Sequence, residues 1–190
     1  TIFNISNKSN IFPTDYTPAG SGVDPWNIDV VGNYAYVTEY VPDSLVIFDV
    51  TNKSDIIELG TYANTTVIEQ PRGIHVSGDY AYIAGEASNT FAIIDVSNKS
   101  NPTLSSYVDN TTYLSGAADV FYVDDFLFTT SRTSDVIAIY DVSDKSNPSF
   151  IKNYTTANWN PTAIEVRGNY AYVSNQMGQA FMILDVTYSN

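Results

Sequence analysis

The sequence predicts an all-β protein folded as a β-propeller of four-stranded antiparallel blades, with about four blades in this chain. The first observation is a repeat of about 45 residues, a length typical of propeller blades. The same turn occurs at Gly32, Gly78 and Gly168, and Asp124 takes its place once. The second observation is that short runs of Val, Ile, Tyr, Phe and Thr alternate with Gly, Asn, Asp and Ser. Such runs are typical of strands, and no stretch has the period of an amphipathic helix.

The second repeat illustrates the four strands that we expect in each blade. They run over Gly73–Ser77, Tyr80–Ala84, Thr90–Val96 and Thr103–Val108. The first two are joined by Gly78-Asp79, a two-residue hairpin signal, because glycine supplies the positive φ that such turns need. Segments rich in Ser and Asn separate the later strands, as expected for turns.

The third strand of each repeat is apolar at nearly every position. A strand that is apolar on both faces must be covered on both faces. Blades stacked around an axis provide this cover, because each sheet lies between its two neighbours. The four strands are Leu45–Phe48, Phe91–Ile94, Ile137–Tyr140 and Phe181–Leu184.

The strands at the two ends of the chain do not match the number that a closed four-blade ring needs. Ile2–Ile5 aligns with a third strand and Ile11–Tyr16 with a fourth, while the last repeat supplies only three strands. This gives one strand more than four complete blades hold. We therefore expect terminal strands shared across a seam, with Ile11–Tyr16 completing the last blade, or shared between subunits. We interpret the chain as one propeller domain, 1–190, with repeats at approximately 1–22, 23–68, 69–114, 115–158 and 159–190.

These residues carry a resemblance to a known family. The third strands and the aspartate after each of them, as in Leu45-Val46-Ile47-Phe48-Asp49, resemble the signature of LVIVD-repeat proteins. The same pattern occurs at 91–95, 137–141 and 181–185. The resemblance covers nearly the whole chain and implies a β-propeller of a bacterial or archaeal secreted or cell-surface protein. It implies little about activity, because propellers host unrelated functions.

Composition excludes several classes of partner. The 190 residues carry a net charge of −13, a sequence pI of about 4.1 and no cysteine. Such a chain repels phosphate backbones, so we expect no nucleic-acid partner, and neither disulfides nor thiolate metal sites can form. No apolar run approaches the ~20 residues that span a bilayer, so we expect no membrane insertion. Because the chain starts at Thr1 inside a repeat, we expect a processed chain or an excerpt of a longer one.

The innermost strands present weak candidates for a metal site. Asp29, His75 and Glu165 occupy one repeat position, where an Asp, a Glu and the single His could meet in a central channel. Oxygen and imidazole ligands suit several divalent cations. Phe121 occupies the same position in the third repeat, and we favour a polar channel lining. We therefore expect neither a metal nor another cofactor.

The loops before the innermost strands suggest a ligand-binding rim. Trp26, Arg72 and Trp159 lie in or next to these loops, at one end of the ring. Tryptophan rings stack on sugars or protein partners, and arginine is a frequent anchor at interfaces. The alternative is that each Trp covers the end of a blade.

A repeated aspartate follows each third strand. A ring of carboxylates is one interpretation, but each of these residues lies just before Ser, Thr or Asn, where an Asp side chain caps a turn. Asn4 occupies the same position without a charge. We therefore favour a structural role for Asp49, Asp95, Asp141 and Asp185.

Seven Asn-X-Ser/Thr sequons predict N-glycosylation, and nearly all lie in expected turns or at strand ends, where a glycan can project. The alternative is that these asparagines only form turns. Because glycosylation needs export, the sequons favour an extracellular or cell-surface protein. The sequons begin at Asn4, Asn7, Asn52, Asn64, Asn98, Asn110 and Asn153.

The leading functional hypothesis is a non-enzymatic structural or surface-interaction module, N-glycosylated and self-associating through an unmatched terminal strand into a fibre or surface layer. The second is a glycan- or protein-binding module that uses the rim. The third is a metal-dependent hydrolase that uses the channel. The sequence shows no catalytic triad, phosphate loop or pair of acid–base carboxylates.

Overall fold

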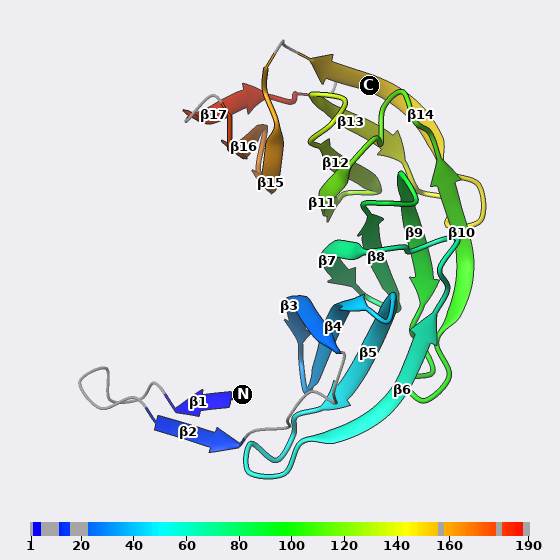
Figure 1. The fold of residues 1–190 in the computed structure, drawn as a ribbon, viewed down its shortest axis with the longest axis vertical. Coiled ribbons are helices and arrows are strands. Elements are labelled where there is room, and N and C mark those ends of the chain that lie inside the picture. The colour runs from blue at the N-terminus through cyan, green and yellow to red at the C-terminus, as the bar shows by residue number, and fades with distance from the viewer. Residues whose placement is uncertain (1, 5–11, 16–22, 156–157, 178–179, 188–190) are drawn as a thin grey trace.

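The structure is a computed structural model whose residues form strands, turns and loops. It describes residues 2–4, 12–15, 23–155, 158–177 and 180–187. In this described part of the chain, seventeen strands form four large sheets and one two-stranded sheet, and the large sheets follow one another along an open arc (Figure 1). Among these residues there is no helix long and apolar enough to cross a membrane. The all-β propeller prediction is confirmed.

The sheets correspond to the repeats. The first blade contains β3 (Asp24–Val31), β4 (Tyr34–Val41), β5 (Ser44–Asp49) and β6 (Ile57–Ala63). The second contains β7 (Pro71–Ser77), β8 (Tyr80–Gly85), β9 (Thr90–Asp95) and β10 (Thr103–Asp109). The third contains β11 (Ala117–Val123), β12 (Phe126–Ser131), β13 (Val136–Asp141) and β14 (Ser149–Thr155). The fourth contains β15 (Pro161–Arg167), β16 (Tyr170–Asn175) and β17 (Ala180–Asp185).

Within each blade the strands pair antiparallel in chain order. The first strand of every blade lies on the inner side of the arc, and the fourth strand lies on the outer side where one is described (Figure 1). The tight turns between first and second strands have the expected backbone, with φ of 60° at Gly32, 58° at Gly78 and 56° at Gly168. In the third repeat Asp124 and Asp125 adopt φ of 48° and 65°.

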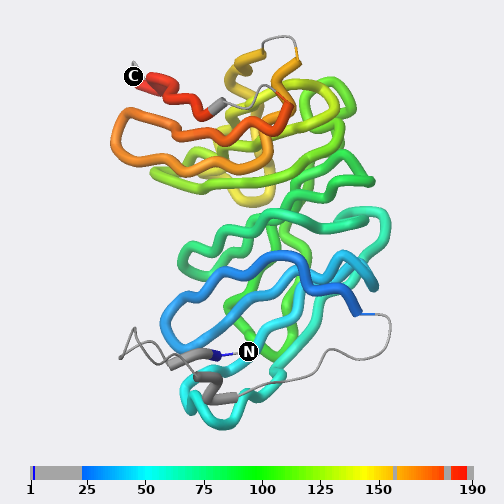
Figure 2. Tube along the Cα trace, turned by 60° about the vertical axis from the view of Figure 1, so that its left-hand side comes forward, coloured from blue at the N-terminus to red at the C-terminus, as the bar shows by residue number. Residues whose placement is uncertain are grey.

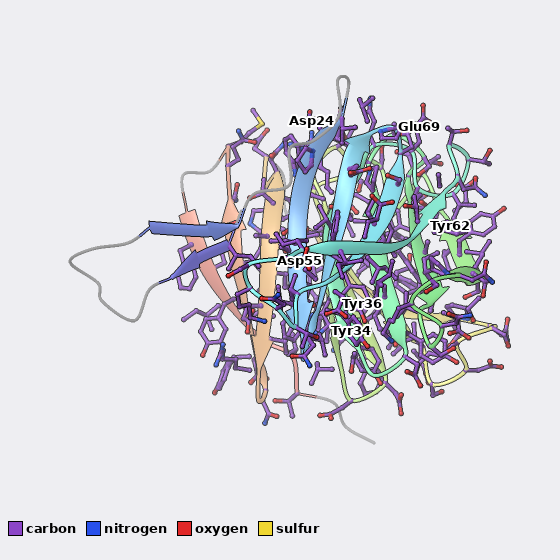
Figure 3. The ribbon with its side chains drawn as sticks, turned by 90° about the horizontal axis from the view of Figure 1, so that it is seen from below. Asp24, Tyr34, Tyr36, Asp55, Tyr62 and Glu69 are labelled. Carbon is purple, nitrogen blue, oxygen red and sulfur yellow. The ribbon has the colours of Figure 1, made fainter. Side chains whose placement is uncertain are left out.

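The third strands are buried on both faces at the internal positions of the arc. Every residue of β9 from Thr90 to Ile94 is buried, because the first and third blades cover its two sides. Tyr36 and Leu45 of the first blade pack in one cluster with Ile74 of the second. Tyr36 is labelled in Figure 3. Burial of one such side chain contributes about 1.5–3 kcal/mol, so the interfaces between blades are a main source of stability.

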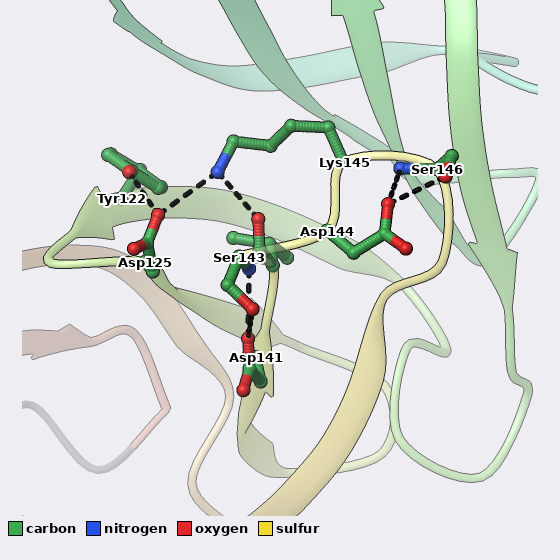
Figure 4. A network of polar contacts seen from close by, with 8 residues as sticks. Tyr122, Asp125, Asp141, Ser143, Asp144, Lys145 and Ser146 are labelled. Carbon is green, nitrogen blue, oxygen red and sulfur yellow. Dashed lines mark hydrogen bonds and ion pairs between the residues drawn. The ribbon is translucent and has the colours of Figure 1, made fainter.

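The segment after each third strand forms a repeated polar turn. The Asp141 carboxylate accepts a hydrogen bond of 2.8 Å from the backbone N–H of Ser143 (Figure 4). Lys145 then donates to the carbonyl oxygen of Val142 at 2.6 Å and to Asp125 at 3.1 Å. The other three blades repeat the aspartate contact, which confirms the turn-capping interpretation. The equivalent bonds join Thr51 to Asp49, Ser97 to Asp95 and Thr187 to Asp185.

The terminal strands differ from one of the two expected arrangements. β1 (Ile2–Asn4) and β2 (Phe12–Asp15) pair with each other in a separate two-stranded sheet. The last blade has three strands in the described part of the chain, and β2 does not complete it. The expectation that Ile11–Tyr16 completes the last blade is therefore not confirmed, since its described part, β2, pairs with β1. Local pairing of two strands that are adjacent in sequence needs only a short loop to close, whereas the seam needs the arc to close.

Candidate functional site

Two repeat positions meet at one rim of the arc. The first lies near the start of each innermost strand, and the second lies at or just after the end of the second strand. Within each set, the four residue types all differ. The first set is Trp26, Arg72, Ala118 and Thr162, and the second set is Tyr40, Glu86, Arg132 and Gln176. A pocket of about 450 Å³ at this rim is lined by six of these residues together with Ser174 and Asn175.

Arg72 joins the first and second blades at this rim pocket. Its guanidinium carbon lies 4.1 Å from the ring centroid of Trp26 and 5.3 Å from that of Tyr40. The two rings are themselves 5.5 Å apart. A cation over aromatic faces is attracted by their quadrupoles, so these contacts hold Arg72 in place. Trp26 remains 50% exposed and available to a ligand.

Glu86 lies between two arginines from neighbouring blades. One carboxylate oxygen contacts Nε of Arg72, and the other contacts Nη2 of Arg132. Burial lowers the pKa of both guanidinium groups, and repulsion from Arg72 lowers the pKa of Arg132 further. One carboxylate facing two guanidinium groups leaves the cluster with one net positive charge. Nε of Arg132 is buried without a hydrogen-bond partner in the described part of the chain.

Trp159 does not belong to the rim pocket. Its side chain is only 7% exposed and packs with Phe128, Ile137 and Ile164 between the third and fourth blades. An indole buried in this way stabilises the blade interface and cannot stack on a ligand. The structure therefore removes Trp159 from the expected binding surface and keeps Trp26 and Arg72 together.

The candidate metal ligands of the inner strands have separate partners. The Asp29 carboxylate accepts a 2.7 Å hydrogen bond from the backbone N–H of Val76. His75 packs on Phe121 with ring centroids 4.5 Å apart, and burial lowers its pKa. Glu165 forms a 3.1 Å ion pair with Arg167. Among the described residues, no three His, Asp or Glu side chains are placed to hold a metal ion.

The first blade exposes apolar positions that are buried in the next blade. We call the side that a blade turns toward the preceding blade its leading face. On the first blade this face presents Ile28 at 57% and Val30 at 55% exposure. The equivalent Ile74 and Val76 of the second blade are 7% and 5% exposed, because the first blade covers them. A groove of about 630 Å³ runs along this leading face and is lined also by Ile2 of β1.

The fourth blade exposes the complementary side. We call the side that a blade turns toward the following blade its trailing face. On the fourth blade this face presents Phe181 at 68% and Ile183 at 56% exposure, whereas Phe91 and Ile93, at the same repeat positions, are fully buried. The two open faces lie at opposite ends of the arc (Figure 2).

A family model matches the repeats of this chain. Four segments of the chain, 22–64, 70–110, 122–156 and 161–190, match the model of the LVIVD repeat. The chain belongs to the LVIVD-repeat family. This finding confirms the resemblance in the third strands. No curated protein matches this LVIVD-repeat chain.

Solved structures similar to the LVIVD-repeat chain support the fold alone, because their sequence identities are low. A protein from Lactobacillus plantarum is 19% identical with a TM-score of 0.81, covering 95% of this chain and 59% of its own. The periplasmic gluconolactonase of Pseudomonas aeruginosa is 13% identical with a TM-score of 0.72, covering 85% and 49%. The Cps50 (Swd1) β-propeller domain of Myceliophteria thermophila is 10% identical with a TM-score of 0.70, covering 94% and 60%. The LVIVD-repeat chain thus spans about half to three fifths of their lengths.

Sequence reasoning missed one buried carboxylate in the LVIVD-repeat chain. Asp119 lies on β11, and burial raises its pKa to about 7. Its two oxygens accept 3.0 Å hydrogen bonds from the backbone N–H groups of Val120 and Ile164, which links the third and fourth blades. Gly73 of the second blade leaves the space beside it. The only signal in the sequence was an acidic residue where the other repeats carry Asn, Gly or Ala.

The sequons of the LVIVD-repeat chain occupy turns and one outer strand. Asn52 and Asn98 are exposed, and each side-chain oxygen accepts a backbone hydrogen bond from the serine two residues on, at 3.1 and 3.2 Å. Asn64 and Asn110 are half-buried in turns of the same kind. Asn153 lies half-buried on β14. Asn7 and the side chain of Asn4 lie outside the described residues.

Proposed function

We propose that this LVIVD-repeat chain is a non-enzymatic extracellular structural module whose copies associate head to tail, the trailing face of one on the leading face of the next. One observation carries this proposal. Repeat positions that are buried at every internal blade interface are exposed at both ends of the arc, as Ile28 and Phe181 show against Ile74 and Phe91. Exposed apolar surface of this kind marks an association site.

The two faces suit each other because the chain already contains their interface three times. Inside the arc, a Tyr, Leu or Phe from one trailing face packs in one cluster with an Ile or a Val of the next leading face. A second copy offers apolar side chains of similar kind at the same repeat positions. Such a heterologous contact either closes a ring or continues as a filament. This arrangement places the association on blade faces, and the terminal strands would add main-chain pairing at its edge.

Sedimentation velocity of the 190-residue chain over a range of concentrations tests the assembly. We expect concentration-dependent oligomers that are lost in Ile28→Lys and in Phe181→Lys, because each places a charge in an apolar contact. Tyr107→Lys is the matched control, since Tyr107 is 46% exposed on β10, away from both faces. We expect it to assemble normally.

A mixture of the two variants gives the sharpest result. Ile28→Lys keeps an intact trailing face and Phe181→Lys keeps an intact leading face, so the mixture should form heterodimers although neither variant assembles alone. A wild-type chain that stays monomeric at high concentration would overturn the proposal. The two faces would then be covered by other blades of a longer protein.

The extracellular part of the proposal is supported by the exposed sequons at Asn52 and Asn98. The turn hydrogen bonds engage their side-chain oxygens and not their amide nitrogens, the atoms to which a glycan is attached. Intact mass spectrometry of native material should therefore show glycan masses above the 20.9 kDa polypeptide. The bare polypeptide mass on native protein would remove glycosylation and, with it, the main support for export.

A second candidate function is ligand binding at the rim. The contact between Trp26 and Arg72, at 4.1 Å, places an exposed indole and a half-buried cation at one pocket. Such convergent groups in a concave site favour a small ligand or a glycan. Loss of glycan binding in Trp26→Ala would support this function, and unchanged binding across a broad glycan panel would count against it.

A further inference from the structure

We propose that the rim pocket binds a carboxylated sugar of hexuronate size, with its carboxylate on Arg132 and Arg72. The inference makes the rim-binding candidate specific. It does not depend on head-to-tail assembly, because the pocket and the trailing face are tested by different variants.

The charge of the pocket favours an anion. The chain carries a net charge of −13 and only three arginines, yet two of them meet here. Glu86 contacts one nitrogen of each guanidinium, so the cluster has one unbalanced positive charge. Nε of Arg132 is buried and has no partner among the described residues. A buried donor without a partner is unfavourable, and an acceptor removes that penalty once the Arg132 side chain, which is 23% exposed, turns toward it.

The geometry favours a carboxylate over a dianion. A guanidinium group matches the two oxygens of a planar carboxylate with two parallel hydrogen bonds. One carboxylate brings one negative charge, which balances the single net charge of the cluster. A phosphate dianion would leave an excess negative charge close to Glu86, which already lies between Arg72 and Arg132.

The opposite wall of the pocket favours a sugar ring. Thr162, Ser174 and Gln176 of the fourth blade provide hydroxyl and amide groups that can bond to sugar hydroxyls. Trp26 of the first blade also lines the pocket. Its side chain is 50% exposed, which suits stacking on the apolar face of a pyranose. The volume of about 450 Å³ lies in the range of small-molecule sites.

The scaffold repeats while the pocket does not. The positions that build the blades carry the same or a similar residue type from repeat to repeat, as Tyr36, Tyr82, Phe128 and Tyr172 do. The pocket positions carry a different type in every blade. The first blade therefore supplies an indole, the second and third each supply a guanidinium group, and the fourth supplies hydroxyl and amide groups. Such a mixed set of groups suits a specific, asymmetric ligand.

Titration of the chain with glucuronate tests the inference by calorimetry and by tryptophan fluorescence. The chain has two tryptophans, and Trp159 is buried, so a ligand at the rim should change the signal of Trp26 alone. Glucose, acetate and inorganic phosphate are the comparison ligands. We expect glucuronate to bind at least ~10-fold more tightly than each of them, since they lack the carboxylate, the ring or the single charge.

Four variants separate ligand binding from a structural role of the cluster. Arg132→Gln should weaken glucuronate binding ~10-fold or more, and Arg167→Gln, which alters an exposed arginine outside the pocket, should leave it unchanged. Glu86→Gln raises the net charge of the cluster from one to two and should strengthen binding ~3-fold or more, which a purely structural cluster would not do. Thr162→Val removes one hydroxyl from the pocket and should weaken glucuronate binding severalfold. It provides the test if the arginine variants fail to fold.

The outcomes decide the inference in either direction. Absence of binding at millimolar glucuronate, equal binding of glucose, or equal binding of acetate or phosphate would overturn it. Weaker binding in Arg167→Gln to the same degree as in Arg132→Gln would also overturn it, because the effect would then be general charge. Measurement in the Phe181→Lys variant keeps the result independent of assembly, since that substitution changes the trailing face and leaves the rim residues in place.

Discussion

Arg72 lies over the indole ring of Trp26, 4.1 Å from its centroid, although the two residues occupy the same position of successive repeats. The shared position brings them to the same rim of adjacent blades. The difference between their side chains turns that proximity into a contact worth about 0.5–2 kcal/mol. Repetition of the backbone thus places side chains together, and divergence at single positions gives the place its chemistry.

Ile93 and Ile183 occupy one repeat position and should respond differently to truncation. Ile93 is fully buried between blades, so Ile93→Ala should lower the free energy of unfolding by about 2–5 kcal/mol. Ile183 is 56% exposed, so Ile183→Ala should lower it by less than ~0.5 kcal/mol. Urea unfolding measures both losses, with each substitution made in the Phe181→Lys chain at low concentration so that assembly does not contribute. Similar losses for the two variants would show that the trailing face is covered within a single copy.

Two glycines of the second blade should tolerate substitution to different degrees. A Cβ at Gly73 would press on Oδ1 of Asp119 and lie 2.5 Å from its Cα, so Gly73→Ala should destabilise by about 1–3 kcal/mol or prevent folding. Gly78 has φ of 58° and open space around it. Gly78→Asn should cost less than about 1 kcal/mol, because asparagine tolerates this conformation. Thermal unfolding compares them, and a larger loss for Gly78→Asn would contradict the packing.

Asp119 should make the protein less stable as the pH rises from about 4 to about 7. Burial raises the pKa of its carboxyl to about 7, so the folded chain holds this proton more tightly than the unfolded chain does. That contribution is complete below the unfolded pKa and is lost as the pH passes through the folded pKa, by up to ~4 kcal/mol.

The matched variant for this effect is Asp119→Asn, which has no titrating proton. Unfolding free energies at pH 5 and pH 7.5 should differ less in the variant than in the wild type. At pH 5 the variant should itself be weaker by ~1 kcal/mol, because a single amide oxygen cannot accept from both Val120 and Ile164. An unchanged pH slope would show that another group carries the titration.

The turn-capping aspartates should act at the acid end of the pH range. Hydrogen bonds from Ser97 lower the pKa of the Asp95 carboxyl below its ordinary value. Its stabilising contribution is therefore present above the unfolded pKa and is lost as the pH falls through the folded pKa. Asp95→Asn keeps an oxygen for the turn, so it should be nearly as stable at pH 7 and lose less below pH ~4. Circular dichroism during acid titration checks this, and a large loss at pH 7 would show a role beyond the turn.

Local patterns predicted the parts of the fold that depend on neighbouring residues. Glycine turns, apolar third strands and capping aspartates each need only a few residues to form, and the structure confirms all three. The rim was predicted in part: Trp26 and Arg72 share it, while Trp159 is buried. The burial of Trp159 depends on packing between two blades, which no local pattern encodes.

The sequence by itself determined the blade, because the period of its apolar residues and the φ preferences of its turns act within about 45 residues. The tertiary structure alone decided which blades adjoin, and hence which equivalent positions are covered. It left Ile28 and Phe181 open, buried Asp119 between blades, and brought Glu86 against Arg132. Burial and charge pairing depend on distances between repeats, and those distances exist only after the blades have packed side by side.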